Sequence, residues 1–407
     1  MSALSSIQHV QSFADQTVLL TGSTGGMGGC LLYKLTLQLP TKKVYVLCRG
    51  SRQKAITKWR KSLGSCVDAI LTTKKVVFVI GDIVLPNFGI NQHDMENVRR
   101  DTTVIIHSAA SIALNSELSD AIEQNCLPCL ELARMASSFL KLRLLVQTST
   151  AYVNTFLPNG KINERIYNDV ADQNPEMELQ HILKTGDHPN TAKYTWPYAH
   201  SKHLMERLLQ TRHSNLPILI VRPTIIGPAI RHPFPHYGPP GSNPASTFAR
   251  VFLSSGSEPM VFHVPQGQTS GTNILDEVPV DWVANVALLH IAAGSVGIVH
   301  AGANLYIPRT LDSLLDAMRD SVCGDVKWQL PKIIFSDDHS TEQCFLAQLF
   351  RICANNWDFD CQRSEQFKEL TGPLSLKIDG HEMVRFTEKR AREIAREVVA
   401  ASRSARL

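Results

Sequence analysis

Short apolar runs alternate with longer amphipathic segments over much of this chain. The runs are rich in valine, isoleucine and leucine, and most are followed by glycine or small polar residues. Uninterrupted apolar runs are typical of strands buried on both faces, and their alternation with amphipathic segments predicts an α/β protein with a parallel sheet. The strands are expected at 17–20, 43–48, 76–80, 103–106, 143–147, 217–221 and 298–300.

The amphipathic segments predict helices on the faces of this sheet. The main ones are expected at 115–141, at 195–211 and from residue 278 onward. Beyond Pro308 the pattern changes to three helical segments with charged faces, at 310–322, 341–354 and 387–403, and the seven charges of 387–397 indicate a solvated face. We therefore expect an N-terminal extension over 1–16, a sheet domain over 17–307 and a smaller, mainly helical part over 308–407.

A glycine-rich run joins the first predicted strand to the first predicted helix. Gly22, Gly25 and Gly28 recur at every third position, and Ser23, Thr24, Gly26 and Met27 lie between them. Glycines at this place let the backbone approach a pyrophosphate, and the following helix offers free N–H groups and the positive end of its dipole. The run therefore predicts a doubly wound Rossmann-type sheet that binds a dinucleotide. The alternative is a tight turn that binds nothing.

The end of the second strand indicates which dinucleotide is bound. An acidic residue there would accept from the ribose 2′-hydroxyl, whereas an arginine suits a 2′-phosphate. Arg49 occupies this position, and Arg60 lies in the segment that follows. The pattern favours NADPH over NADH. The alternative is that both arginines are ordinary surface charges.

The other strand ends are expected to line the cofactor. Asp82 and Ile83 follow the third strand, where a carboxylate would accept from the adenine amino group and an aliphatic side chain would pack on the ring. Ser108 and Ala109 follow the fourth strand and are small enough to leave room for the cofactor. Pro223 ends the sixth strand and is expected to hold the backbone beside the nicotinamide.

Three residues form the candidate catalytic group. Thr150 follows the fifth strand, and Tyr198 and Lys202 lie one turn apart on the predicted helix 195–211. An ammonium beside a phenol lowers the pKa of the phenol, so Tyr198 is expected to pass a proton to a carbonyl oxygen that Thr150 also holds. Tyr198 and Lys202 would also touch the cofactor. The alternative is an ordinary pair on a solvated helix face.

Asn125 is a further catalytic candidate, because asparagine is mildly unfavourable inside a helix. Either it is a surface residue, or it holds a water that continues a proton path from Lys202. The polar segment 154–193 lies between the two halves of the site and is expected to form a lid. The segment 231–247, rich in proline and glycine, is expected to shape a pocket.

Composition narrows the classes of partner. The chain has 407 residues, 43% of them hydrophobic, and a formal charge of +4, which gives no reason to expect a nucleic-acid partner. Nine scattered cysteines fit a reducing compartment, and the isolated pair Cys126 and Cys129 lacks the second pair that a zinc site needs, so no metal is expected. Neither a signal peptide nor a membrane span is predicted. We expect a cytoplasmic protein; peripheral membrane association and the oligomeric state stay open.

Eight segments together resemble a known family. The chain is similar to the extended short-chain dehydrogenases/reductases, and more narrowly to the male-sterility-type fatty acyl-CoA reductases and the thioester reductase domains of carrier-protein synthetases. The matching segments are TGSTGGMG from Thr21, VYVLCRG from Val44, GDI from Gly81, VIIHSAA from Val104, STAYVN from Ser149, YAHSK from Tyr198, PILIVRPTIIGP from Pro217 and VPVDWVAN from Val278. Gly26 and Met27 depart from the pattern, which usually has two larger apolar residues there.

The resemblance implies NADPH-dependent reduction of an acyl thioester, carried by CoA or by a carrier protein, to an aldehyde and with a second hydride to the primary alcohol. It places Thr150, Tyr198 and Lys202 at the catalytic positions. The helical pattern of the C-terminal part separately predicts that this part covers the substrate side. The resemblance does not carry over a C-terminal membrane anchor, and a free-standing enzyme is expected. Two alternatives remain: a carbonyl reductase or hydroxyl dehydrogenase of sterol-, terpenoid- or polyketide-like molecules, and a non-catalytic protein that senses NADP.

Overall fold

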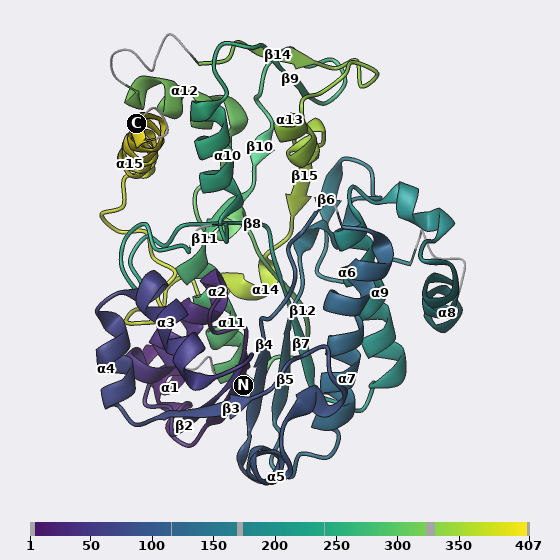
Figure 1. Cartoon of the computed structure of the whole chain (residues 1–407), viewed down its shortest axis with the longest axis vertical. Coiled ribbons are helices and arrows are strands. Elements are labelled where there is room, and N and C mark those ends of the chain that lie inside the picture. Colours follow the sequence, from purple (N-terminus) through teal and green to yellow (C-terminus); the bar gives the residue numbers. More distant parts are fainter. Residues whose placement is uncertain (1–4, 115, 169–173, 240, 323–329, 405–407) are drawn as a thin grey trace.

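A seven-stranded parallel sheet organises the chain (Figure 1). The computed structural model describes residues 5–114, 116–168, 174–239, 241–322 and 330–404. The strand order across the sheet is β12-β7-β5-β4-β1-β2-β3, so the chain winds in both directions from β1, as predicted for a doubly wound Rossmann-type sheet. The strands are β1 (Thr17–Thr21), β2 (Lys43–Cys48), β3 (Val76–Ile80), β4 (Val104–His107), β5 (Leu144–Thr148), β7 (Ile218–Pro223) and β12 (Gly297–Ala301).

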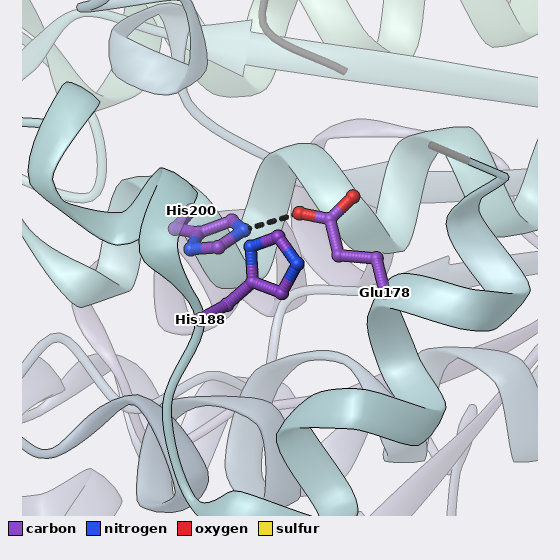
Figure 2. Close-up of side chains that lie close together, drawn as sticks. All are labelled: Glu178, His188 and His200. Atoms are coloured by element: carbon purple, nitrogen blue, oxygen red, sulfur yellow. Dashed lines mark hydrogen bonds and ion pairs between the residues drawn. The ribbon is translucent and has the colours of Figure 1, made fainter. Parts of the chain in front are cut away.

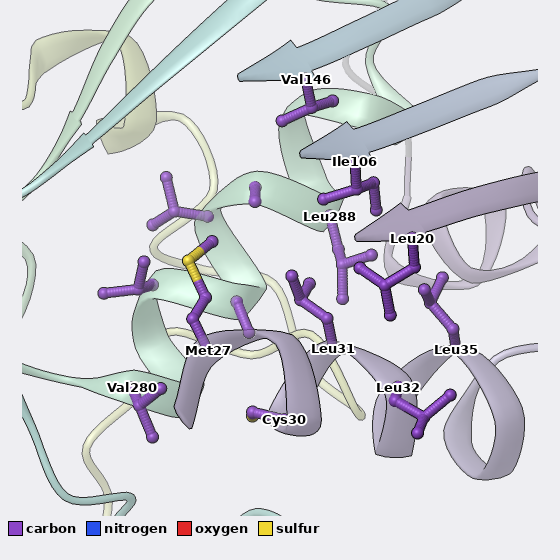
Figure 3. Close-up of a cluster of buried hydrophobic side chains, with 14 of the residues drawn as sticks. Leu20, Met27, Cys30, Leu31, Leu32, Leu35, Ile106, Val146, Val280 and Leu288 are labelled. Carbon is purple, nitrogen blue, oxygen red and sulfur yellow. The ribbon is translucent and has the colours of Figure 1, made fainter. Parts of the chain in front are cut away.

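One face of the sheet is covered by helices α2 (Gly26–Tyr33) and α11 (Val280–Ala292). Figure 3 shows leucines of α2 and Leu288 of α11 against Leu20, Ile106 and Val146, which project from three neighbouring strands. On the same side lie α1 (Ser6–Gln11), α3 (Arg52–Leu63) and α4 (Cys66–Thr72). Because α2 starts directly after β1, this packing fixes the helix N-terminus at the carboxyl edge of the sheet.

The other face is covered by α6 (Leu118–Asn125), α7 (Leu127–Ala136) and α9 (Pro197–Arg212), with α5 (Gln92–Asp101) at the end of the sheet (Figure 1). The single helix predicted over 115–141 is wrong, because two helices meet at Cys126. Pro128 lies in the first turn of α7, where its missing N–H costs nothing, but it could not continue the preceding helix. Residue 115 lies outside the described residues.

A second body lies above the carboxyl edge of the sheet, as Figure 1 shows. Its own apolar core joins α10 (Pro244–Ser254), α12 (Leu311–Ser321) and α15 (Met383–Ser404). Its short strands pair across the predicted boundary at residue 308: β14 (Ile333–Ser336) with β9 (Met260–His263), β13 (Arg309–Thr310) with β10 (Ile274–Leu275), and β15 (Trp357–Phe359) with β6 (Gly160–Ile162). The remaining elements are β8 (Ile225–Gly227), β11 (Glu277–Pro279), α8 (Pro175–Thr185), α13 (Phe345–Leu349) and α14 (Gln362–Glu365).

The segment 154–193 is anchored to the helix that carries Tyr198. Glu178 of α8 is buried, and its two oxygens contact His200 Nε2 at 2.6 Å and Arg207 Nη1 at 2.5 Å, both on α9. Figure 2 shows His188 beside this pair. Burial opposes ionisation of Glu178, but His200 and Arg207 outweigh it and lower the pKa of the carboxyl to about 2. Helix α8, which belongs to this segment, is thus held against α9 by buried ionic contacts.

Glu178, His188 and His200 also offer metal-ligand atoms that lie within 4.8 Å of one another. Arg207 already neutralises the carboxylate. His188 Nδ1 accepts the Asn190 N–H, so in a neutral ring the proton lies on Nε2 and no lone pair is left for a metal. We therefore interpret this group as the ionic network that holds α8 on α9.

Candidate active site

The turn after β1 requires glycine at two positions, because a side chain there would collide with neighbouring backbone atoms. Gly22 has φ +75°, and a Cβ there would lie 2.6 Å from the Ala109 nitrogen. A Cβ on Gly28 would lie 2.1 Å from the Gly22 oxygen. Helix α2 begins at Gly26 with the exposed Gly25 as its N-cap and without a side-chain cap, so its first N–H groups are open to an anion.

Residues of the turn and of β4 hold each other in place. Ser108 Oγ donates to the Thr21 oxygen at 2.7 Å, and the Ala109 N–H donates to Thr21 Oγ1 at 3.2 Å. Both residues are half-buried beside Gly22, at the position predicted for them. Met27 is buried, and Thr24 is half-buried.

The segment 231–247 lies over this turn, and its position was not predicted from the sequence. Tyr237 Oη donates to the Gly26 oxygen at 3.0 Å, and a Cβ on Gly29 would lie 2.3 Å from the same hydroxyl. The buried Asp281 accepts the N–H groups of residues 230–232 at 2.9 to 3.1 Å. The prediction that 231–247 shapes a pocket gave no position. The sequence did contain one signal of the approach of Tyr237, which is Gly29, the glycine that directly follows Gly28.

The two arginines proposed for the 2′-phosphate differ in their surroundings. Arg49 is exposed at the end of β2. Arg60 lies near the end of α3, and its Nη2 is 2.7 Å from Asp68 Oδ1 in an exposed ion pair. Arg52, at the start of α3, lies over the Phe78 ring at 5.0 Å. Arg49 is therefore the better placed of the two proposed residues.

The residues after β3 are partly engaged in their own loop. Asp82 Oδ1 accepts the Val84 N–H at 3.4 Å, and the Asp82 N–H donates to the Phe88 oxygen at 2.8 Å. Ile83 is half-buried against the core beneath α6 and α7. Both side chains lie at the carboxyl end of β3, where the adenine pocket is predicted.

Lys202 connects α9 to the end of β5, two residues before Thr150. Its Nζ donates to the Thr148 oxygen at 3.2 Å, and the side chain is buried. Thr150 is buried too; its hydroxyl accepts the Tyr152 N–H at 3.3 Å and donates to the Pro223 oxygen at 3.5 Å. The second bond is long enough to be weak, so this hydroxyl can turn toward a carbonyl oxygen.

Tyr198 lies in the first turn of α9 and is half-buried. Within the described ranges its hydroxyl has no hydrogen-bond partner, which leaves it for a ligand. The expected lowering of its pKa is wrong for this structure. Burial, and after it the nearby Cys129 thiol, raises the pKa of Tyr198, while burial also lowers the pKa of the Lys202 ammonium. The phenol is thus held in the protonated form, which is the form that donates.

Asn125 is buried, so the surface interpretation is wrong. Its Oδ1 accepts the Ser111 N–H at 2.9 Å, and its Nδ2 donates to the Ser111 oxygen at 3.1 Å. The side chain therefore fixes the loop that follows β4. Whether it also holds a water on a proton path stays a prediction.

A fully buried ion pair positions α9 against β7. Glu206, one turn after Lys202, contacts Arg222 through Oε2 to Nη2 and through Oε1 to Nε at 3.0 Å. Arg222 Nη1 also donates to the Arg165 oxygen at 2.9 Å. Pro223, the residue predicted beside the nicotinamide, directly follows this anchor and is buried.

A small cleft opens two residues beyond Thr150. Its volume is about 10 Å³, and the side chains of Tyr152, Ile225, Trp357 and Phe359 line it together with Asp276. Trp357 and Phe359 come from β15, which pairs with β6 of the segment 154–193. The cleft thus lies close to the place where the C-terminal part meets the segment 154–193.

Asp276 makes the stability of the protein depend on pH. Burial raises the pKa of this carboxyl to about 6, although Oδ1 accepts the Ala303 N–H at 2.6 Å. Because the folded pKa lies above the unfolded one, stability falls as pH rises from about 4 to about 6, by about 3 kcal/mol for this group. Asp276→Asn should therefore raise the urea midpoint at pH 7.5 and change it little at pH 4. Equal midpoints at pH 7.5 would contradict this.

The turn fits a dinucleotide. Ser23 Oγ is buried and has no partner in the part of the chain that the structure describes, and the N-terminus of α2 is open beside it. An unpaired donor next to open N–H groups matches the acceptor oxygens of a pyrophosphate. A parallel sheet wound both ways from β1, with this glycine turn directly after β1, defines a Rossmann-type fold.

Comparison with known proteins gives the family. A family model described as male sterility protein matches residues 20–287, and the chain belongs to this family. Fatty acyl-CoA reductase 1 of Xenopus laevis is 29% identical over 298 residues, which are 68% of this chain and 54% of the relative. The chain thus spans about half the length of this relative.

Solved structures agree on the fold. The reductase domain of a non-ribosomal peptide synthetase from Mycobacterium tuberculosis has a TM-score of 0.62 at 15% identity, and the match covers 97% of this chain and 96% of that chain. Gre2 from Candida albicans, solved in complex with NADPH, has a TM-score of 0.60 at 14% identity, covering 94% and 99%. None of the helices in the described part of the chain has the length and apolar character that a bilayer crossing requires.

Proposed function

We propose that this protein reduces an acyl thioester to an aldehyde, with NADPH as its cofactor. The observation that carries the proposal is the Lys202 Nζ bond to the Thr148 oxygen, which brings α9 with Tyr198 to the strand end that carries Thr150. Membership of the male sterility family and the likeness to a fatty acyl-CoA reductase support the thioester as substrate.

NADPH, when bound, supplies the hydride. The N-terminus of α2 and the turn around Gly25 would hold its pyrophosphate, and Arg49 its 2′-phosphate. Lys202 would donate to the ribose from its place beside Thr148. Asp82 and Ile83 would form part of the adenine site. Ser108 and Ala109 are small and would leave room for the cofactor. Pro223 would border the nicotinamide.

The chain's own residues would act on the carbonyl. The hydroxyls of Thr150 and Tyr198 donate to the carbonyl oxygen and stabilise the oxyanion that forms. The acyl chain would extend toward the apolar side chains of Tyr152, Ile225, Trp357 and Phe359. Collapse of the tetrahedral species expels a thiolate, which needs no proton. If the aldehyde is reduced further, Tyr198 protonates the alkoxide.

The test is a panel of acyl-CoA thioesters beside the matching aldehydes and ketones. NADPH oxidation with thioester, release of free CoA and an aldehyde or alcohol product are expected. Turnover of ketones alone, with inert thioesters, would instead select a carbonyl reductase on the same site.

Arg49 should decide the choice of cofactor. Arg49→Ala is expected to raise KM for NADPH by about ten- to a hundred-fold, because a charge-assisted contact to the 2′-phosphate is lost, and to leave KM for NADH unchanged. Arg60→Ala is the matched control, since this arginine already pairs with Asp68 on the surface. Equal effects of the two substitutions would assign the 2′-phosphate elsewhere.

A further inference from the structure

A second pocket lies where the C-terminal helix α15 meets strands β8 and β11, above the sheet in Figure 1. It is small in this structure, about 10 Å³, and its charged lining comes from Glu277, Arg309 and Arg390. Gly227 belongs to the lining as well. A Cβ there would lie 2.6 Å from Glu277 Oε1, so the glycine makes room for the carboxylate.

Two guanidinium groups share this single carboxylate. Glu277 Oε2 contacts Arg309 Nη2, and Glu277 Oε1 lies 3.0 Å from Arg390 Nη1. All three residues are buried, with at most 7% of their surface exposed. Burial lowers the pKa of Arg390 to about 10, and burial together with Arg390 lowers the pKa of Arg309 to about 9. One positive charge is therefore left without compensation in the pocket lining that the structure describes.

Hydrogen-bond donors are also in excess. Besides Glu277, Arg309 donates to Thr387 Oγ1 at 3.0 Å and Arg390 to Asn243 Oδ1 at 3.5 Å. A guanidinium carries five N–H donors, so each arginine keeps N–H groups in reserve. Asn243 Nδ2 is buried and has no acceptor within the described ranges. Surplus charge and surplus donors both call for an anion rich in acceptor oxygens.

The pocket is linked to the phosphate-binding turn. Asn243 follows Ser242, and Ser242 Oγ lies 2.9 Å from the position of a Cβ on Gly26. The chain thus runs directly from the start of α2 to the arginine pair. Arginine is the side chain best suited to phosphate, because its planar fork matches two oxygens at once.

We propose that Arg309, Arg390 and Asn243 form a phosphate site that recognises a phosphate ester during the reaction. The phosphate has two possible sources: the phosphopantetheine arm that carries the acyl thioester, which rests on the proposed function, and the dinucleotide itself. Glu277 holds the two arginines in place and competes with the anion for them.

The experiment is isothermal titration of the full chain with inorganic pyrophosphate at constant ionic strength. Arg390→Met should weaken binding by about ten- to a hundred-fold. Glu277→Gln should strengthen it, because the competing carboxylate is gone, and this opposite direction cannot come from poor folding. Arg250→Met is the matched control, since Arg250 also contacts α15, but through an exposed pair with Glu397 at 2.6 Å.

The same titration with 4′-phosphopantetheine and with NADP⁺ identifies the source of the phosphate. A loss confined to phosphopantetheine in Arg390→Met assigns the site to the thioester carrier, and a loss confined to NADP⁺ assigns it to the cofactor. Because binding needs no turnover, the result stands even if no thioester is reduced. Unchanged binding of all three ligands in folded Arg390→Met, or weaker pyrophosphate binding in Glu277→Gln, would overturn the proposal.

Discussion

Tyr198→Phe should slow aldehyde reduction far more than thioester reduction. Both steps lose a hydrogen bond to the oxyanion, which costs about 10²–10³-fold. Only the aldehyde step also needs a proton, because the alkoxide must be protonated whereas the thiolate leaves without one. That step should lose a further factor of about 10² or more. Single-turnover rates with an acyl-CoA and with the matching aldehyde measure the two losses.

Tyr194→Phe is the matched control for this substitution. Tyr194 lies four residues before Tyr198 and is buried, but its hydroxyl bonds to His203 Nδ1 at 2.6 Å. The control should keep the ratio of the two rates. Because burial raises the pKa of Tyr198, its phenol stays protonated at neutral pH, and the wild-type rates should show no titration of this group there. Equal losses in both steps would refute the division of roles.

Glu206→Ala should lower the free energy of unfolding by about 3–5 kcal/mol, because it leaves the guanidinium of Arg222 buried without its partner. Both side chains are fully buried, so water cannot replace the carboxylate. Urea denaturation measures the change. Since Glu206 lies one turn after Lys202, the surviving protein should also bind NADPH more weakly.

Two further variants separate a buried charge from a lost contact. Glu206→Leu combined with Arg222→Met removes both charges and should recover most of the stability. Arg212 also lies on α9 and pairs with Glu176 of α8 at the surface. Arg212→Met breaks this pair and should cost about 1 kcal/mol or less. A loss in Glu206→Ala no larger than that of Arg212→Met would show that the buried pair does not anchor α9.

The sheet was predictable because a parallel sheet is buried on both faces, so its strands appear as continuous apolar runs. All seven predicted strands lie in the sheet, within three residues of their predicted bounds. The glycine spacing was equally informative, because Gly22 and Gly28 stand where backbone atoms come too close for a side chain.

Contacts between distant segments were not predictable. The pairing of β15 with β6 joins short stretches almost two hundred residues apart, and neither has a pattern that names its partner. Charge was misleading for the same reason. The segment 387–397 was predicted as a solvated face, yet Thr387 and Arg390 are buried, because the partner of Arg390 is Glu277 on the distant strand β11.

The central claim is that the carbonyl carbon of an acyl thioester accepts a hydride at Thr150 and Tyr198. The most direct test is a single turnover of an acyl-CoA with NADPH in which both hydrogens at C4 of the nicotinamide are deuterium. The account predicts that the first equivalent of NADP⁺ formed is accompanied by one equivalent of free CoA. It also predicts deuterium on C1 of the product. Oxidation of the cofactor without release of CoA, or a product without deuterium at C1, would contradict it.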